Sequence, residues 1–260
     1  MAETTRFSPW PRRLTVLAAI LCFGAVSAAL IAAVGTGQGA WDFRAGLTTL
    51  RYAFFAAAAG LIVALVAAIV ARRSGRGLVA ANLLAILVAA GFVAFVANQV
   101  RIAWSVPPIH DISTDLEDVP QFSVLSVRPD NLEAIPDLGR PELAALPPLE
   151  RWKAVHREAY GDIATIRVPW SPAETVDRAR RLGEARGWDI VAADPARGTL
   201  EATDTSRFFR FKDDVVLRVR PDANGSGAMV DMRSISRVGT SDVGVNAWRV
   251  RGFLADLRRG

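Results

Sequence analysis

The stretch LVAANLLAILVAAGFVAFVANQV, residues 78–100, contains 23 consecutive residues without a charged side chain. Two further stretches in the first hundred residues share this property, residues 14–34 with 21 residues and residues 52–70 with 19. An α-helix needs about 20 apolar residues to cross the hydrocarbon core of a bilayer. The sequence therefore predicts three membrane-spanning helices. Buried core helices, the alternative, would rarely supply three such runs within one hundred residues.

Aromatic residues flank the predicted spans. Trp10 precedes the first run, Trp41 follows it and Trp104 follows the third. An indole ring is stable at the headgroup level, because its apolar body and its polar N–H are both satisfied there. These tryptophans therefore support the span boundaries.

Arginine is distributed unevenly among the segments that connect the spans. The loop 35–51 carries Arg44 and Arg51, offset by Asp42. The N-terminal flank and the turn at 71–77 together carry six arginines: Arg6, Arg12, Arg13, Arg72, Arg73 and Arg76. The positive-inside rule predicts a cytoplasmic N-terminus and places the residues after Trp104 across the membrane. For a bacterial inner membrane protein, the C-terminal domain would then be periplasmic.

A cleavable signal peptide is the alternative for the first run. Residues 14–34 are longer than a usual apolar signal region, but Val26-Ser27-Ala28 resembles a cleavage site. Cys22 is the single cysteine, so neither an intramolecular disulfide nor a multi-cysteine metal site is possible. It follows a bulky leucine, which does not fit a lipoprotein cleavage site, and we interpret it as a small buried apolar group.

The alkaline isoelectric point belongs to the apolar half of the chain. Residues 1–100 have a net charge of +6, and residues 101–260 have a net charge of −1. A basic patch on a folded soluble face would indicate nucleic-acid binding, and this distribution excludes it. The predicted spans contain no ionisable residue other than Cys22 and Tyr52, and they include the small-residue stretch Ala56–Gly60. We interpret them as an anchor, which could also form homo-oligomers through these small residues, and not as a transporter.

The sequence predicts three consecutive parts: a membrane anchor at 1–103, a proline-rich strap or linker at 104–150, and a domain at 151–260. Residues 105–150 hold eight of the 14 prolines, which favour extended backbone. Ser171, followed by Pro172 and Glu174, predicts a helix start, and Gly187 its end. Other expected elements are strands at 165–168, 188–193, 199–204, 213–220 and 228–236 and a helix at 242–258. The predicted fold is α+β, an antiparallel sheet with two helices packed on one face.

The second hairpin alternates with a period of two residues. Val215 and Leu217 point one way and Val216 and Arg218 the other, while Asp231 and Arg233 alternate with apolar residues on the partner strand. The pattern predicts a sheet with one face in water.

Five ordered motifs in the C-terminal half resemble an uncharacterised family called domain of unknown function 1499. They are the segment from Pro107 to Asp115 with Pro120 and Phe122; Gly187-Trp188 with Glu201-Ala202-Thr203; Phe211–Val215; Arg233–Gly239; and Ser241-Asp242 with Gly244, Asn246 and Arg249. The resemblance covers residues 105–258. It implies bacterial or plastid proteins that are often exported or membrane-attached, and it supplies no activity and no catalytic residue.

His110 and Asp111 begin an acidic segment that includes Asp115. They could form an acid/base pair or, with Asp115, a divalent-cation site. A calcium loop counted from Asp111 would need Gly and Glu where Leu116 and Phe122 stand. We favour the alternative that these side chains satisfy the amides of turns.

Two other segments carry candidate catalytic groups. Asp213 and Asp214 are adjacent on a strand and so point to opposite faces; we expect Asp214 to pair with an arginine and Asp213 to be solvated or to cap a turn. The segment from Gly239 to Gly244 resembles a nucleophile elbow around Ser241, but its second glycine comes one residue late. The alternative is that Ser241 or Asp242 caps the last helix.

The same region contains a candidate anion site. Free N–H groups at a helix start, with Arg233 and Arg237 upstream, could bind phosphate or carboxylate. The predicted ligand-binding residues are Arg233, Arg237, Ser241, Asp242, Asn246 and Arg249. Cross-strand salt bridges are the alternative use of these arginines.

The sequence thus favours a membrane-anchored, extracytoplasmic binding or scaffolding module for an anion or a lipid headgroup, and it leans away from an enzyme. Its partners would be the bilayer and an envelope protein or lipid. Neither a phosphate-binding loop nor a dinucleotide motif is present, so no cofactor is predicted. The alternative is a hydrolase-like envelope enzyme using His110/Asp111 and Ser241/Asp242. That alternative requires His110 to meet a second polar group inside a cleft.

Overall fold

The structure, a computed structural model, describes residues 9–133 and 135–260. The chain forms two compact units. One contains the residues up to Arg101 together with the short loop Arg207–Arg210, and the other contains Ile102–Ser206 and Phe211–Gly260. Arg6, one of the arginines of the N-terminal flank, lies outside the described residues.

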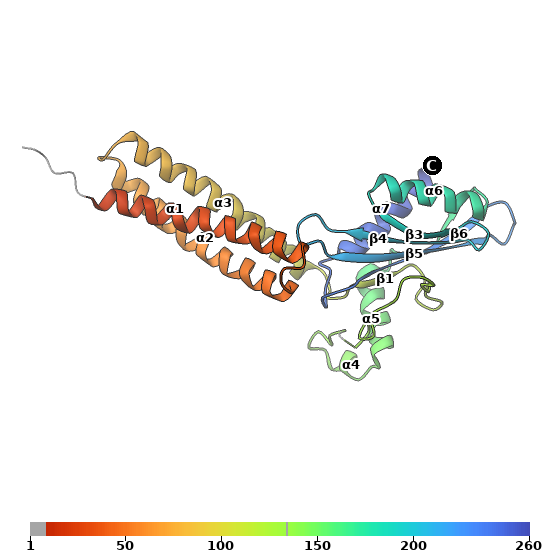
Figure 1. Cartoon of the computed structure of the whole chain (residues 1–260). Helices are drawn as coiled ribbons and strands as arrows, with labels where there is room; N and C mark the ends of the chain where they lie inside the picture. Colours follow the sequence, from red (N-terminus) through yellow and green to blue (C-terminus); the bar gives the residue numbers. More distant parts are fainter. Residues whose placement is uncertain (1–8, 134) are drawn as a thin grey trace, which may run out of the picture. The chain divides into compact units, whose positions relative to one another are not determined.

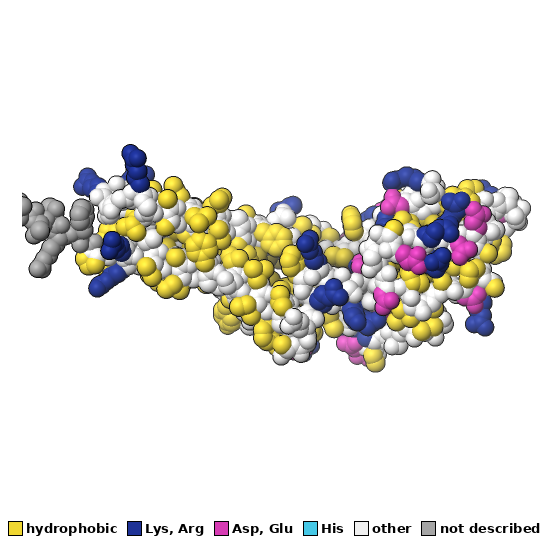
Figure 2. Space-filling model, turned by 45° about the horizontal axis from the view of Figure 1, so that its top comes forward, with side chains coloured by type: hydrophobic (Ala, Val, Ile, Leu, Met, Phe, Trp, Pro, Cys, Tyr) yellow, Lys and Arg dark blue, Asp and Glu magenta, His cyan; other side chains and the backbone are white. Residues whose placement is uncertain are grey.

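Three helices build the first unit: α1 (Trp10–Gly37), α2 (Phe43–Ala71) and α3 (Arg76–Ser105), whose last turn belongs to the second unit. Each helix is long and apolar enough to cross a membrane, which confirms the three predicted spans in length and composition. Figure 2 shows hydrophobic side chains over much of their visible surface. Such a surface suits contact with lipid tails.

Small residues fill the interior of this helical unit. Ala57 is fully buried, and a Cβ added to Gly60 would come within 2.9 Å of the Cys22 sulfur. Cys22 is buried, as predicted. Helix backbones approach this closely only where side chains are small. At these positions the small-residue face packs inside a single chain, so their substitution would disturb the unit itself.

The second unit is built on a six-stranded antiparallel sheet in the order β1-β6-β5-β4-β3, with β2 also paired to β6. The strands are β1 (Asp111–Ser113), β2 (Ile166–Val168), β3 (Asp189–Asp194), β4 (Thr199–Thr205), β5 (Lys212–Pro221) and β6 (Ala228–Ser236). Both predicted hairpins are confirmed, each strand to within one residue at its ends. Polar turns at Asp194–Gly198 and Asp222–Gly225 connect them, as the Gly, Asp and Asn content indicates.

Two helices cover one face of the sheet, as predicted: α6 (Pro172–Ala185) and α7 (Val245–Arg259) (Figure 1). Ser171 caps α6, since its hydroxyl accepts a hydrogen bond from the Glu174 amide at 3.2 Å. The apolar residues of β4, β5 and β6 on this face pack with both helices, and Trp188 stacks on Phe253 of α7 with ring centroids 4.7 Å apart.

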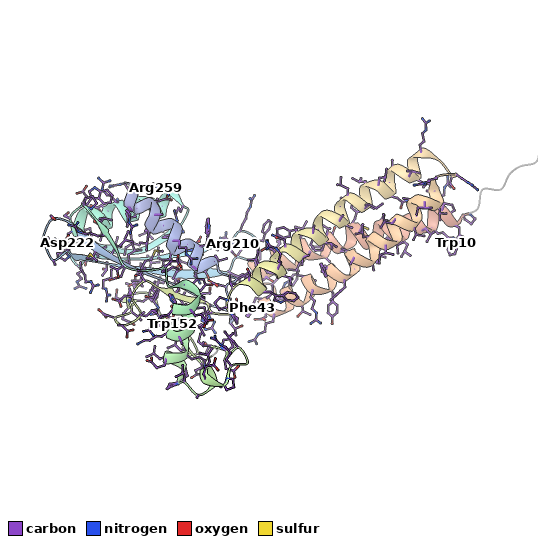
Figure 3. The ribbon with its side chains drawn as sticks, turned by 180° about the vertical axis from the view of Figure 1, so that it is seen from behind. Trp10, Phe43, Trp152, Arg210, Asp222 and Arg259 are labelled. Atoms are coloured by element: carbon purple, nitrogen blue, oxygen red, sulfur yellow. The ribbon has the colours of Figure 1, made fainter. Side chains whose placement is uncertain are left out.

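The opposite face is covered by the proline-rich segment, called the strap below (residues 106–147), and by α5 (Pro148–Tyr160) (Figure 1). Sequence analysis did not predict α5, nor that the strap supplies the edge strand β1 and the single turn α4 (Pro141–Ala144). Trp152 of α5, labelled in Figure 3, is buried, and its indole N–H donates to the Asp111 carbonyl at 2.8 Å. The strap is therefore part of the domain.

The prediction of a sheet face in water is wrong. Glu201, Asp231 and Arg233 lie on the face predicted to be wet, and each is at least 94% buried. The alternation of polar and apolar residues is real, but the polar face meets charged and polar groups of the strap instead of solvent. Buried charges are tolerated only when they are paired or hydrogen-bonded, and the pairs that achieve this define the site described next.

Candidate functional site

An ion pair between β1 and β6 joins the strap to the sheet. The antiparallel register places Asp111 opposite Ile235, next to Arg233 on the same face. Arg233 donates to both carboxylate oxygens of Asp111, from Nε at 2.9 Å and from Nη2 at 2.7 Å. Both side chains are buried. Such a bidentate pair fixes the relative orientation of the two side chains and neutralises both charges.

His110 extends this pair into a longer chain of polar contacts. Asn131 donates from Nδ2 to Asp111 at 2.6 Å, which turns its amide oxygen toward His110 Nε2 at 2.9 Å. His110 Nδ1 lies 3.2 Å from the Thr240 carbonyl oxygen. Both partners are acceptors, so both contacts are hydrogen bonds only when each ring nitrogen carries a proton. The ring is fully buried and connects the strap to the loop before α7.

Glu201 of β4 binds the strap at a second point. Its carboxylate accepts hydrogen bonds from the amides of Ser123, Val124 and Leu125, the last at 2.7 Å, and from the Ser123 hydroxyl at 2.6 Å. Burial alone would raise the pKa of Glu201, but these donors outweigh burial and the pKa lies below its ordinary value. Three successive backbone amides around one carboxylate form an anion-binding nest, already occupied by the protein's own side chain.

A third attachment surrounds Asp231 of β6, which is fully buried. Arg218 Nη2 reaches it at 3.0 Å and also reaches Asp115 of the strap at 3.3 Å. Arg220 Nη2 approaches Asp231 at 2.7 Å. The Asp115 carboxylate also accepts from the amides of Glu117 and Asp118, as expected for a turn-capping aspartate. Asp115 therefore faces Arg218 and turn amides, whereas Asp111 faces Arg233.

The other predicted ligand-binding residues form a separate cluster at the start of α7. Arg249 pairs with Asp213 at 2.7 Å and Asp204 at 2.9 Å. Asn246 is fully buried and contacts Ser234 and the His110 carbonyl. The expectation that Asp213 is solvated or caps a turn is therefore wrong, because Asp213 is a buried partner of Arg249.

Ser241 and Asp242 cap the turn before α7. The Ser241 hydroxyl accepts from the Val243 amide at 3.1 Å, and the Asp242 carboxylate accepts from the amides of Gly244 and Asn246. Burial raises the pKa of Asp242, and these two amides oppose the rise. Gly244, with φ near +80°, is the residue directly before the helix. The prediction that Ser241 or Asp242 is the N-cap is therefore wrong: the cap position is Gly244, without a side-chain cap, and α7 begins three residues later than predicted, at Val245. The Asp242 carboxylate still binds the Asn246 amide in the first turn of α7.

Arg237, one of the predicted ligand-binding residues, lines a surface hollow. The hollow has a volume of about 380 Å³ and is bounded by Val124–Arg128, Asp214, Ile235, Ser236 and Arg237. Arg237 pairs with Asp214 through Nε and Nη2, both at 2.8 Å, as predicted for Asp214. Its side chain is still 41% exposed. Arg128 contributes a second guanidinium, which also binds Asp130 and the Gly239 carbonyl.

A second hollow, of about 440 Å³, lies between the strap and α5 and includes Thr114–Glu117, His156, Tyr160 and Thr165 in its wall. His156 Nε2 accepts from the Ser113 amide at 3.2 Å, so the neutral ring carries its proton on Nδ1. Within the described part of the chain, His156 Nδ1 and the Tyr160 hydroxyl are buried without a hydrogen-bond partner. Burial lowers the pKa of His156 to about 4 and raises the pKa of Tyr160 to about 12.

Across residues 9–133 and 135–260, no group of three or more His, Cys, Asp or Glu side chains is placed to hold a metal ion. Sequence reasoning missed Glu201, Asn131 and Arg128, which join the strap to the sheet or line the Arg237 hollow. A sequence pattern pointed to Glu201 alone, because acids and arginines alternate on one face of neighbouring strands, whereas Asn131 and Arg128 lie in the strap outside any strand. The same pattern is typical of a solvated sheet face, and only the contacts between the strap and the sheet, which are distant in sequence, distinguish the two cases.

These features define a class of protein: an α+β domain with a strap held by ions on the polar face of its sheet, preceded by three helices that can span a membrane. The chain belongs to the family described as "Protein of unknown function (DUF1499)", whose profile matches residues 111–257. The resemblance found in the sequence is thereby confirmed. No curated protein matches the chain.

The Glu201 contact with the strap can be tested by Glu201→Gln. One amide oxygen replaces two carboxylate oxygens, so the Val124 and Leu125 amides lose their charged acceptor. We expect the free energy of unfolding to fall by about 1–3 kcal/mol. Hydrogen exchange of the full-length protein in detergent should be faster at residues 123–125. Glu184→Gln, which removes an exposed ion pair on α6, is the control. Unchanged exchange at 123–125 would contradict the assignment.

The burial of His156 predicts a pH-dependent stability. The unfolded ring takes up a proton near pH 6.5, but the folded ring does so only near pH 4. The unfolded state therefore binds more protons between these values, and the free energy of unfolding should fall as the pH is lowered through this window, by at most about 1.4 kcal/mol per pH unit. Urea unfolding between about pH 7 and 5 measures the slope, which His156→Gln should flatten. Equal slopes in both proteins would show that His156 does not cause it.

Proposed function

We propose that this protein is a membrane-anchored binding module of the bacterial inner membrane, with a cytoplasmic N-terminus and a periplasmic C-terminal domain that binds an anionic group. The three apolar helices support the anchoring. The N-terminal flank and the turn 71–77 together carry six arginines, whereas the loop 35–51 carries two and one aspartate, and this excess supports the orientation. Close packing of the three helices through small residues supports an anchoring role for them.

The observation that carries the binding proposal is the hollow at Arg237. Arg233 and Arg249 are buried and each forms strong internal pairs, so neither is exposed to a ligand. Arg237 and Arg128 instead face the same hollow, and the acid that pairs with Arg128 is the exposed Asp130. An external phosphate or carboxylate can compete with an exposed acid at little cost. The planar guanidinium groups suit either ligand.

The chemistry that fits this hollow is an acidic group presented from outside, on a lipid headgroup or on an envelope partner. The backbone of Ser126–Arg128 forms one wall and the end of β6 forms the other. Because the wall is strap backbone, its geometry depends on Glu201 and Asp111 holding the strap on the sheet. The attachment of the strap and the binding of a ligand are then parts of one arrangement.

The enzyme alternative gains no support from the arrangement of its candidate residues. His110 meets polar partners, as that alternative requires, but it does so in the buried interior, and it lines neither the hollow at Arg237 nor the one at His156. Asp111 is engaged by Arg233, and Ser241 and Asp242 accept hydrogen bonds from backbone amides. The observed contacts of these four residues are with other groups of the protein and stabilise the fold.

Anion binding can be tested on the full-length protein in detergent with inorganic phosphate and glycerol phosphate as probes. Arg128→Gln removes one guanidinium from the hollow and should raise the dissociation constant by at least about tenfold, since a charge-assisted hydrogen bond contributes about 1.5–3 kcal/mol and 1.4 kcal/mol is a factor of ten. Equilibrium dialysis measures the change. Arg197→Gln, in the exposed turn between β3 and β4, is the matched control and should bind like the wild type. Equal affinity in all three proteins would refute binding at this hollow.

The orientation can be tested with two matched serine-to-cysteine substitutions in a Cys22→Ala background. Ser226→Cys lies in the exposed β5–β6 turn and Ser74→Cys in the turn between α2 and α3. A membrane-impermeant maleimide added to spheroplasts should label position 226 at once and position 74 only after lysis, because the arginine-rich turn stays in the cytoplasm. The reverse labelling pattern would overturn the proposed orientation.

A further inference from the structure

The second unit has one end that is fixed close to the exit of α3 by covalent connection. The uncharged run of α3 ends at Val100, and the helix continues to Ser105, about 8 Å further along its axis. Trp104, on this last turn, is 86% exposed. Only five residues separate Ser105 from β1, which begins at Asp111. If α3 spans a bilayer, this end of the domain lies near the headgroups, whatever the orientation of the rest.

The start of α7 belongs to this same end. Val106, the first residue after α3, packs on Gly244, since a Cβ on Gly244 would lie 3.2 Å from a Val106 methyl carbon. The Asp242 amide lies 3.5 Å from the Ile109 carbonyl oxygen. Asp213 of β5 pairs with Ser236 of β6, so the loops that precede β5 and follow β6 also leave the sheet here.

Several exposed apolar side chains lie at this end, among them the most exposed tryptophan that follows α3. Trp248, on the first turn of α7, is 74% exposed, and Val245 and Val238 are also exposed. The loop 206–211 joins the end of β4 to the start of β5 and contains the exposed Phe208, although residues 207–210 are grouped with the helical unit. Turns 195–198 and 222–227, at the other end of the strands, carry no large hydrophobic side chain. A solvated domain seldom gathers such side chains without a partner.

The charges at this end fit one particular partner. The β4–β5 loop carries Arg207, Arg210 and the following Lys212, and residues 206–211 contain no acid. Figure 3 labels Arg210, which precedes β5, and Asp222, which follows it. A mixture of Trp, Phe and basic residues is typical of surfaces that lie in the headgroup layer of anionic membranes.

We propose that this end of the domain, centred on Trp248, is a membrane-contacting surface that lies in the headgroup region of an anionic bilayer. Trp248 and Val245 enter the interface with their apolar parts, and the basic residues of the β4–β5 loop bind lipid phosphates. The surface borders the hollow at Arg237 but uses other side chains, and it does not require a ligand in the hollow. It rests on the membrane-anchoring part of the proposed function.

The test uses the full chain in a Cys22→Ala background with one new cysteine, labelled with an environment-sensitive fluorophore. The protein is reconstituted into phosphatidylcholine–phosphatidylglycerol vesicles with or without brominated acyl chains. Trp248→Cys and Val245→Cys report on the proposed surface. Asn224→Cys, in the distant turn, is the water-exposed control, and Ile62→Cys, exposed on α2, reports whether the helices are embedded.

We expect brominated lipid to reduce fluorescence about twofold at positions 62, 245 and 248 and to leave position 224 unchanged. If position 62 is quenched while 245 and 248 behave like 224, the membrane-contacting surface is refuted and the anchor stands. If position 62 is not quenched, the anchoring proposal fails and this inference fails with it. Shielding of 248 from a water-soluble quencher, without lipid quenching and dependent on the protein-to-lipid ratio, would assign the surface to a second copy and refute the lipid assignment.

Discussion

The ion pair between Asp111 and Arg233 is the contact on which the architecture of the second unit depends. It joins the strand that follows the apolar helices to the central part of a sheet formed more than one hundred residues later. Removing either partner would leave a buried charge without compensation, which costs more than the intact pair contributes to stability. The pair therefore contributes little net stability, but it selects one position of the strap, because any other position leaves a buried charge unpaired. Asn131 donates to the Asp111 carboxylate and Trp152 to the Asp111 carbonyl, and His110 contacts Asp111 only through Asn131.

The same logic explains the polar face of the sheet. Glu201, Asp231 and Arg233 would be at least as stable in water as under a strap, so burial needs specific partners. The strap offers them: three amides for Glu201, the carboxylate of Asp111 for Arg233, and Asp115 for the arginine that binds Asp231. An apolar strap over an apolar face could shift by two residues along the strands and lose little buried contact area. A charged strap cannot, because each shift separates every pair at once.

Sequence analysis succeeded where short-range physics decides the structure. The uncharged runs, the Ser171 cap and the alternating hairpins each follow from residues within one element, and the structure agrees with them. Sequence analysis failed where the structure depends on contacts between residues that are far apart in the sequence. The strand at Asp111–Ser113 has three residues, too few for a periodic pattern, and exists because β6 pairs with it. Arg233 and Arg249 looked like ligand-binding residues because their carboxylate partners, Asp111 and Asp213, could not be assigned to them from the sequence. Arg237 remains a candidate ligand-binding residue because Asp214 covers only part of its guanidinium group.

The short connection between α3 and β1 gives the polar strap a mechanical role as well. Ile109 is buried two residues before β1, so the chain becomes part of the domain almost as soon as it leaves the helix. A flexible linker would let the domain sample many orientations, whereas a connection of five residues that ends in an edge strand restricts them. In the proposed membrane contact, groups at the α7 end would meet the membrane at a high effective concentration, so that weak contacts by a few aromatic and basic side chains would suffice. The charges that lock the strap would then favour the presentation of this surface to the bilayer.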